Sequence, residues 1–354
     1  MEVECVKVRK TDGDSAIKLI KRLDLANSEF KITHSDDFVF IPLKRKLSKA
    51  NVKNLEHSVD YFEEKLFEMM PRQRRRSLID VLEDQQLPQH IVSSVPKALD
   101  IIGHVSVLEI PSELKDYRKV IGEAILKTHK NVKSVLAKAG GVDGVYRLRK
   151  YELVAGDEKT LTIHREHGCR FVVDVKKTYF SPRLAYEHER VSKQVREGET
   201  VIDMFAGVGP FSILISKTHE NIRVYAVDIN SDAFKFLKQN VSLNHVEGKV
   251  ITICDDARKI ICQRLGGIAD RVIMNLPKKG FEFIDVACKA LKPEGGVIHF
   301  YEFASDEDVV GKAVEDFRRA VGKVGRRVRE IKTVKLVKSI APGESQIVVD
   351  AIIE

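Results

Sequence analysis

The sequence of 354 residues predicts an α/β protein whose C-terminal half is a doubly wound, mostly parallel sheet. From residue 176 onward, short apolar runs alternate with amphipathic stretches of helical spacing, which is the pattern of strands joined by crossover helices. One run ends in a glycine-rich turn that leads into a helix, as expected at the ligand-binding edge of such a sheet. The strand candidates are 200–205, 223–228, 250–254, 271–274 and 296–301, followed by 327–335 and 346–353.

The chain is too long for one compact core, which predicts two or three domains. We expect a small α/β domain with its linker at 1–70, a middle α/β domain at 71–175 and the large sheet domain at 176–354. In the first domain the patterns predict a strand at 3–8, a helix at 15–25 and a hairpin at 30–43. In the middle domain we expect helices at 77–83 and 112–129 and strands at 141–150, 160–164 and 169–175.

Between the first two domains, residues 44–76 are polar and basic and are interpreted as a linker that contains a helix. The helical pattern is carried by Leu55, Val59, Phe62 and Leu66. The run of basic residues at 72–76 is either a solvated helix end or, as a hypothesis, a contact to a nucleic acid.

The composition allows a polyanionic partner without requiring one, because the net charge of +8 is spread along the chain. The five cysteines are scattered and form no CxxC pair, and there is no HExxH, so neither a disulfide framework nor a metal site is expected. No apolar run is long enough to predict a membrane span, and no secretory signal is recognised at the N-terminus. We therefore expect a cytoplasmic monomer.

The glycine-rich turn is the most informative stretch of the sequence. The strand before it ends at Asp203, and Gly207 and Gly209 precede Pro210, which opens a helix. Glycines let the backbone approach a ligand where a Cβ would collide, and the helix N-terminus adds amide hydrogens and a partial positive charge. A nicotinamide-dinucleotide fingerprint would need a third Gly or Ala where Ser212 stands, which disfavours that class of cofactor.

The second strand places a carboxylate at its carboxyl end. Asp228 is suited to accept both hydroxyls of a bound ribose. Capping of the next helix is the alternative task for this residue, but Ser231 already suits it.

The third and fourth strands also end in polar groups. Asp256, followed by Ala257, can accept a hydrogen bond from an adenine amino group. Asn275 stands two residues before Pro277, which lacks an amide donor and leaves the Asn side chain and nearby carbonyls to hold a substrate amino edge. Taken alone, Asn-Leu-Pro-Lys would be explained by an ordinary turn. Four consecutive strands, however, each end in a group that can contact a ligand, which favours a ligand-binding site.

At these residues the sequence resembles the archaeal and eukaryotic tRNA (guanine(37)-N1)-methyltransferases. The resemblance is strong over about 140–354 and holds only in outline for the first domain. It implies a class I Rossmann-like methyltransferase domain that uses S-adenosylmethionine, preceded by two smaller α/β RNA-binding domains, with tRNA as the partner. The matching segments are 146–149, 153–156, 162–164, 179–184, 203–211, 227–230, 256–258, 272–277 and 295–299.

The resemblance also implies roles for individual residues. It implies that Glu187 is the general base, that Arg147 supports the target guanine and the transition state, and that Asn275 and Pro277 frame the base. The residues implied to bind the cofactor are Tyr179, Arg183, Phe205, Gly207, Gly209, Asp228, Ile229, Asp256, Ala257 and Asn275.

Two of these assignments keep alternatives. The family commonly has Glu-Arg, whereas this chain has a second carboxylate at Glu189, which is the other candidate base. A helix capped by Ser181 would also place Glu187 one turn from Arg183, where the two could form a plain surface pair. Arg147 could contact a phosphate instead of the base.

The nearest rival function belongs to wyosine synthesis at the same tRNA position. The chain could transfer the aminocarboxypropyl group of the cofactor, or it could be bifunctional and also methylate a tricyclic wyosine precursor. A nicotinamide-dependent dehydrogenase and a non-catalytic RNA-binding module are the rivals from other classes.

Overall fold

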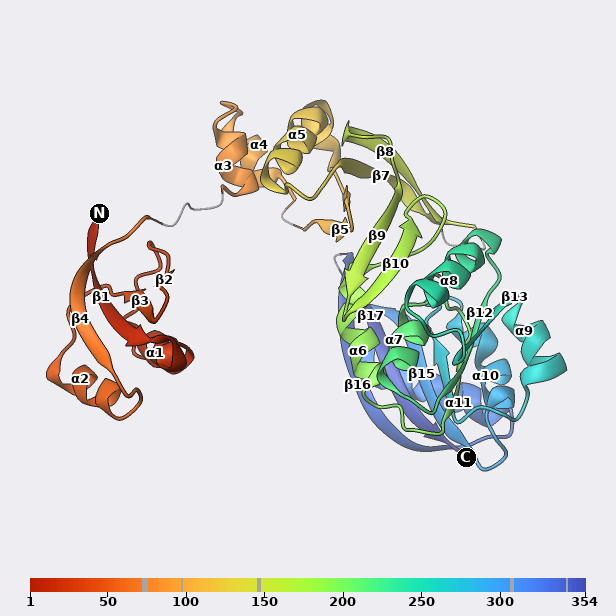
Figure 1. Ribbon diagram of the computed structural model, residues 1–354. Helices are drawn as coiled ribbons and strands as arrows, with labels where there is room; N and C mark the ends of the chain where they lie inside the picture. The colour runs from red at the N-terminus through yellow and green to blue at the C-terminus, as the bar shows by residue number, and fades with distance from the viewer. Residues whose placement is uncertain (72–75, 97, 145–147, 306–308, 342) are drawn as a thin grey trace. The chain divides into compact units, whose positions relative to one another are not determined.

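The computed structural model describes residues 1–71, 76–96, 98–144, 148–305, 309–341 and 343–354. The chain forms two compact units, Met1–Ser77 and Leu78–Glu354 (Figure 1). Each unit has its own sheet and its own buried apolar core.

The first unit is an antiparallel four-stranded sheet in the order β2-β3-β1-β4. Helix α1 buries Ala16, Leu19 and Ile20 against the sheet, as the apolar spacing predicts. The expected strand, helix and hairpin are confirmed, although the first hairpin strand is only two residues long. The elements are β1 (Glu2–Arg9), η1 (Lys10–Asp12), α1 (Gly13–Arg22), β2 (Thr33–His34), β3 (Phe38–Pro42), α2 (Lys49–Glu56) and β4 (Phe62–Glu68).

The interpretation of residues 44–76 as a linker with one helix is wrong in its second half. The helix ends at Glu56, and Phe62 and Leu66 lie in strand β4, which pairs antiparallel with β1 along its whole length. The error has a simple origin, because a spacing of four residues places two side chains on one face of a helix and also on one face of a strand. Residues 72–75 of the basic run lie outside the described residues.

The second unit begins with a mixed four-stranded sheet in the order β5-β6-β7-β8, covered by α3, α4 and α5, and with the hairpin β9-β10. The helices expected at 77–83 and 112–129 are present, the second as a 3-10 turn that continues into α5. The elements are α3 (Leu78–Glu83), α4 (Gln89–Ser94), β5 (Asp100–Ile102), β6 (Val105–Leu108), η2 (Ser112–Tyr117), α5 (Arg118–Thr128), β7 (Ser134–Asp143), β8 (Leu148–Gly156), β9 (Leu161–Glu166) and β10 (Cys169–Asp174).

The single strand expected at 141–150 is wrong. These residues span the end of β7 and the start of β8, which pair antiparallel, and Gly144 lies between them with a φ of +71°. Arg149 lies in β8, whereas Arg147 lies outside the described residues.

The rest of the second unit is a seven-stranded sheet in the order β13-β12-β11-β14-β15-β17-β16. The first five strands are parallel, and β17 and β16 are each antiparallel to their neighbours. The fold prediction is confirmed. The strands are β11 (Thr200–Asp203), β12 (Arg223–Asp228), β13 (Val250–Cys254), β14 (Arg271–Met274), β15 (Gly296–Ser305), β16 (Val328–Ala341) and β17 (Glu344–Ile353).

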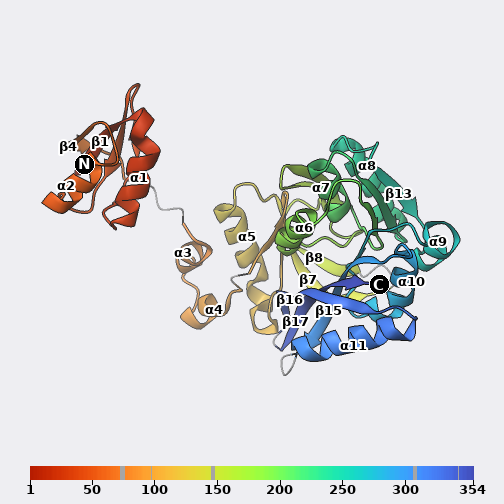
Figure 2. The same ribbon diagram turned by 90° about the horizontal axis from the view of Figure 1, so that it is seen from below.

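Helices cover both faces of this sheet (Figures 1 and 2). One apolar core joins the sheet to α6, α7 and α8, and another joins the opposite face to α9, α10 and α11. The helices and short turns are η3 (Pro182–Leu184), α6 (Ala185–Ser192), α7 (Pro210–Thr218), α8 (Ser231–Leu243), α9 (Ala257–Ile260), η4 (Ile261–Leu265), η5 (Gly280–Phe283), α10 (Ile284–Ala290) and α11 (Val309–Lys323).

Two asparagines, Asn240 in α8 and Asn244 at its C-cap, hold the hairpin strand β10 to this helix. The buried Asn240 side chain accepts from the Val172 amide at 2.7 Å and donates to the carbonyl oxygens of Val172 and Val208 at 3.1 and 3.0 Å. One turn later, Asn244 makes the same pair of bonds to the backbone of Arg170, at 2.9 and 2.7 Å. The two side chains thus bond to backbone groups of β10 that a neighbouring strand would otherwise pair with.

Replacing Asn240 with Ala is expected to destabilise the second unit by about 2–4 kcal/mol, because three buried backbone groups lose their partner. Thermal unfolding measured by circular dichroism provides the test. The matched control is Gln239→Ala on the exposed side of the same helix, which should change stability by no more than about 0.5 kcal/mol. Equal midpoints for the two variants would contradict this account of β10.

Candidate active site

The glycine turn between β11 and α7 requires glycine at its last position. Gly209 has a φ of +93°, and a Cβ there would lie 2.6 Å from the Leu237 side chain and 2.9 Å from that of Ile213. Gly207 also has a positive φ, of +57°, but a Cβ there would make only an ordinary contact, 3.7 Å from the Tyr179 carbonyl oxygen. Pro210 opens α7, as expected from its missing amide hydrogen.

The carboxylate of Asp228 is fixed by the same turn. It accepts from the amide of Gly207 at 2.7 Å and from that of Asn230 at 2.8 Å. Burial raises the pKa of Asp228, and these two amides oppose that rise. The expectation that Ser231 caps the following helix is wrong, because the Asn230 side chain accepts from the first amides of α8. Asp228 is therefore not that cap.

Asp256 has a structural task that the sequence did not reveal. It is the N-cap of α9, and its Oδ1 accepts from the amides of Arg258 at 2.7 Å and Lys259 at 3.2 Å. Both capping bonds go to Oδ1, so the cap does not use Oδ2. Ala257 follows as the first residue of the helix.

The segment after β14 forms a tight turn against the C-terminal hairpin. The Asn275 side-chain oxygen accepts from Gln346 of β17 at 3.1 Å. Pro277 is buried, and Lys278 adopts a φ of +75° while its amide donates to Glu302 at 2.6 Å. Strands β15 and β17 therefore both hold the turn, through Glu302 and Gln346. The bond from Gln346 to the side-chain oxygen of Asn275 also fixes the orientation of the Asn275 amide group.

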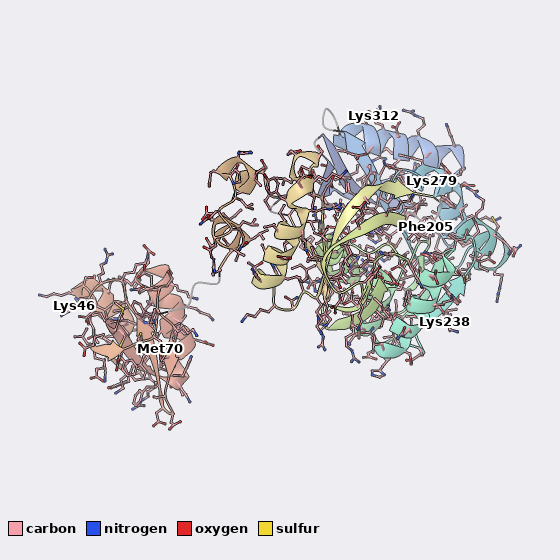
Figure 3. All side chains as sticks on the ribbon, turned by 90° about the horizontal axis from the view of Figure 1, so that it is seen from above. Lys46, Met70, Phe205, Lys238, Lys279 and Lys312 are labelled. Atoms are coloured by element: carbon pink, nitrogen blue, oxygen red, sulfur yellow. The ribbon has the colours of Figure 1, made fainter. Side chains whose placement is uncertain are left out.

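A pocket of about 660 Å³ opens at this edge of the sheet, and Figure 3 labels two of its lining residues, Phe205 and Lys279. Its walls come both from the strands β5 to β8 and from the loops of the seven-stranded sheet. Of the residues that the sequence singled out, the pocket is lined by Tyr179, Arg183, Phe205, Ile229, Asp256, Ala257 and Pro277. The others that the structure describes lie outside the lining, namely Glu187, Gly207, Gly209, Asp228 and Asn275.

Lys338 of β16 is a pocket residue that the sequence reasoning missed. Its ammonium donates to the Tyr179 hydroxyl at 3.2 Å and to Ser181 Oγ at 3.0 Å. Ser181 occupies the expected N-cap position before Pro182, but its side chain makes no capping bond. Lys338 thus ties the start of the helical segment to the far strand of the sheet.

Arg183 and Glu187 do not form the surface pair that was one alternative. Arg183 Nε donates to Asp100 of β5 at 2.6 Å. Glu187 is turned the other way and is only 2% exposed. The interpretation of Glu187 as part of a solvated surface pair is therefore wrong.

Glu187 accepts from three donors on three elements. Arg190 of α6 contacts both carboxylate oxygens through Nε at 3.1 and 3.0 Å and Oε2 through Nη2 at 2.8 Å. The Tyr301 hydroxyl of β15 donates at 3.0 Å, and Lys335 of β16 lies 2.6 Å from Oε1. Burial would raise the pKa of Glu187, but the hydrogen bonds from Arg190 and Lys335 outweigh it and lower the pKa. The side chain is therefore an anion at neutral pH.

The second candidate base, Glu189, has a different environment. It pairs with Lys193 at 2.8 Å, one turn along the same helix, and this bond lowers its pKa. Its side chain is partly exposed to solvent, and no buried donor converges on it among the bonds that the described residues make. The arrangement is that of an ordinary helix-surface pair.

Sequence reasoning missed most of the groups around Glu187. Arg190 could have been found, because a cation three residues after a carboxylate lies on the same helix face. Tyr301 and Lys335 gave no such signal. They come from strands more than 110 residues later, and only the closure of the sheet brings them together.

Asp203, at the end of β11, is a fully buried acid. Its Oδ2 accepts from Ser212 Oγ at 2.7 Å, and its Oδ1 has no partner in the described residues. Burial raises the pKa of Asp203 to about 7, helped by the negative charge of Asp228 and opposed by the Ser212 hydroxyl. The first turn of the site therefore contains a carboxyl group that titrates near neutral pH.

Other kinds of site find no support in the described part of the chain. No group of three or more His, Cys, Asp or Glu side chains there could hold a metal ion. The five cysteines are unpaired, and three of them are buried. None of the described helices combines the length and the apolar composition that crossing a bilayer requires.

Three family models match the chain. They are the TRM5/TYW2 methyltransferase domain over residues 162–329, the TYW2 N-terminal domain over 78–160 and the tRNA methyltransferase 5 N-terminal domain over 5–51. The matches together extend over both compact units.

The chain is also similar along most of its length to individual members of this family. The chain is 40% identical over 345 residues to the tRNA (guanine(37)-N(1))-methyltransferase Trm5b of Pyrococcus abyssi, covering 98% of this chain and 97% of that protein. The solved complex of aTrm5 with tRNALeu is 34% identical, with a TM-score of 0.68 and 99% of each chain covered. The tRNA 4-demethylwyosine(37)-methyltransferase Taw21 of Saccharolobus solfataricus is 35% identical and covers 78% of this chain and 98% of its own.

Substitution of Asp203 by Asn tests the buried acid. The folded state keeps its proton up to about pH 7, whereas an unfolded chain releases it near pH 3.8. The stability of the wild type should therefore fall as pH rises between these values, by an amount on the order of 4 kcal/mol, and Asp203→Asn should lack this loss. Free energies of unfolding at pH 5 and pH 8 provide the comparison, and about 3 kcal/mol of this loss falls between those two pH values.

The partly exposed carboxylate Asp232 offers the matched control, since Asp232→Asn should follow the wild type at both pH values. Parallel behaviour of Asp203→Asn and wild type across this range would show that the acid is already ionised in the folded protein.

Proposed function

The chain belongs to the TRM5/TYW2 methyltransferase family, and we propose that it transfers the methyl group of S-adenosylmethionine to N1 of guanine 37 in tRNA, on the 3′ side of the anticodon. The observation that carries this proposal is the 40% identity to a tRNA (guanine(37)-N(1))-methyltransferase across 98% of the chain. The pocket at the carboxyl edge of the parallel strands is where that fold binds ligands.

The pocket fits the cofactor in size and in chemistry. Its volume is that of a site for a nucleoside with a short side chain, and Tyr179 and Phe205 give it aromatic walls. In this proposal Asp228, next to the pocket residue Ile229, accepts from the ribose hydroxyls, and Oδ2 of Asp256, which the capping bonds do not use, accepts from the adenine amino group. When bound, the cofactor supplies an electrophilic methyl group on a sulfonium.

Glu187 is the proton acceptor in this proposal. The proton on guanine N1 must leave as the methyl group arrives, and a positioned carboxylate accelerates such a step by about 10²–10⁴-fold. Arg190, Tyr301 and Lys335 hold Glu187 as an anion in one orientation. Lys335 is the most exposed of the three, at 28%, so it is the partner that guanine would displace to reach the carboxylate.

The target base is framed by the turn after β14. Asn275 and Pro277 offer an amide and a rigid ring at the strand end, and Gln346 holds the Asn275 oxygen in place. Arg147, assigned by resemblance, would donate to guanine O6, where negative charge develops as N1 loses its proton.

The two smaller parts of the chain bind the rest of the tRNA. We assign residues 1–70 to recognition of the folded tRNA, 71–175 to RNA binding and support of the pocket, and 176–354 to catalysis. The family match over 5–51 and the strands that line the pocket support this division. The enzyme would act as a monomer in the cytoplasm, without a metal.

Transfer of label separates the proposal from its wyosine-pathway rivals. Unmodified tRNA transcripts with guanine or adenine at position 37, and tRNA that carries 4-demethylwyosine there, are incubated with cofactor labelled either in the methyl or in the aminocarboxypropyl group. Methyl label should enter only the guanine transcript, as N1-methylguanine. Aminocarboxypropyl label on the tRNA would contradict the proposal and show that the chain is the rival aminocarboxypropyl transferase. Additional methyl transfer to a tricyclic wyosine precursor would extend the activity to a second substrate.

Glu187→Gln and Glu189→Gln distinguish the two candidate bases. Glu187→Gln should lower the single-turnover rate of methyl transfer by about 10²-fold or more, because the amide cannot accept the N1 proton. Glu189→Gln removes a surface ion pair and should leave the rate within about twofold. Cofactor affinity, measured by calorimetry, should be the same in both. If Glu189→Gln were slow and Glu187→Gln active, Glu189 and not Glu187 would be the general base.

A further inference from the structure

A row of buried charged and polar side chains runs from Glu187 across the C-terminal hairpin. Arg190 contacts Glu187 with one edge and Asp350 of β17 with the other. Asp350 accepts from His299 of β15 at 2.6 Å, and the other ring nitrogen of His299 lies 2.8 Å from Arg271. Asp350 and His299 have no exposed surface, so the row lies inside the domain.

The direction of each bond in the row follows from the donors. Arg271 can only donate, so His299 Nε2 accepts and Nδ1 carries the hydrogen that goes to Asp350. Burial lowers the pKa of His299, in keeping with this neutral ring. Burial would raise the pKa of Asp350, but His299 and Arg190 lower it well below its usual range. Asp350 is therefore a permanent anion behind Arg190.

Such a row is costly to bury, and stability alone does not account for it. Each buried ion loses its hydration, and well-packed apolar residues in the same space are often as stabilising or more so. What the row provides that apolar packing would not is a guanidinium fixed from both sides. Gln194 adds a further donor to Asp350 at 3.4 Å.

We propose that Asp350 is a positioning residue for methyl transfer, which holds Arg190 from behind and offsets its charge so that Glu187 can accept the guanine proton. The inference rests on the proposed role of Glu187. Asp350 does not touch the reacting atoms and acts only through Arg190. His299 acts one step further away, by orienting Asp350.

The charges around Glu187 explain why this offset matters. The groups that face the carboxylate are Arg190 from α6, Tyr301 from β15 and Lys335 from β16, with Asp350 of β17 behind the arginine. Two cations thus face two carboxylates. Without the negative charge of Asp350, both cations would act on Glu187 alone and make it a weaker base.

Asp350→Asn keeps the shape of the side chain and removes its charge. The single-turnover rate of methyl transfer at saturating tRNA and cofactor should fall about tenfold, since general-base efficiency follows the strength of the base. The concentrations of tRNA and cofactor that give half the maximal rate should stay within about twofold. A purely structural role would instead raise both half-saturating concentrations as it lowers the rate, without this split.

Asp270→Asn is the control, because Asp270 is another carboxylate at this sheet whose bonds go to Lys292 and to the Thr200 amide and not to Arg190 or Glu187. It should keep the wild-type rate. A wild-type rate for Asp350→Asn while Glu187→Gln is slow would overturn the positioning role. An active Glu187→Gln variant would instead contradict the role of Glu187 as the base, on which the inference rests. Failure of the Asp350 role and failure of the Glu187 role therefore give different results.

A second variant covers the case in which Asp350→Asn does not fold. Arg190→Lys keeps the positive charge, but one ammonium cannot bond to both oxygens of Glu187 and to Asp350 at once. Its single-turnover rate should fall at least tenfold with unchanged half-saturating concentrations. A wild-type rate for this variant would show that the bridge from Asp350 to Glu187 is not needed.

Discussion

The guanidinium of Arg190 is the group on which the geometry of the candidate site depends. It is buried between Glu187, on its own helix, and Asp350, which lies 160 residues later in β17. A buried cation is tolerated only when it is paired and hydrogen-bonded, and removal of either partner would leave an uncompensated charge. Helix α6 therefore has one register against the C-terminal hairpin, and that register sets where Glu187 lies.

The two halves of the seven-stranded sheet contribute different parts of the site. The parallel half presents strand ends at one edge, and its turns place Gly207, Asp228 and Asp256 beside the pocket. Strand β15 and the antiparallel strand β16 supply Tyr301, Lys335 and Lys338, which contact residues of the segment at 179–187. The bond between Gln346 and the side chain after β14 joins the halves. Neither half alone could hold both a cofactor and a proton acceptor.

The sequence predicted the parallel strands well because buried parallel strands are short, continuous apolar runs between helical patterns. The strands at 223–228, 250–254 and 271–274 have the expected bounds. It failed where local patterns were ambiguous, as for Phe62 and Leu66, whose spacing fits a helix and a strand alike.

The candidate site shows the same limit. Residues near each other in the chain, such as Asp228 and the glycines, could be grouped from sequence, because the carboxyl ends of parallel strands meet at one edge. The cap at Asn230, one residue before the expected Ser231, depends on backbone angles that no pattern encodes. The partners of Glu187 on β15 and β16 depend on long-range strand pairing, which local periodicity does not determine.

The contacts of Glu187 also resolve an apparent conflict in its chemistry. A carboxylate with a lowered pKa is reliably an anion before substrate arrives, but it is also a weak acceptor of a proton. Tyr301 is buried and the Arg190 side chain is 12% exposed, whereas Lys335 is 28% exposed and also lies over the Tyr186 ring. Displacement of Lys335 by guanine would remove one of the two cations, and the pKa of Glu187 would then rise. The base would become stronger only when its substrate is in place.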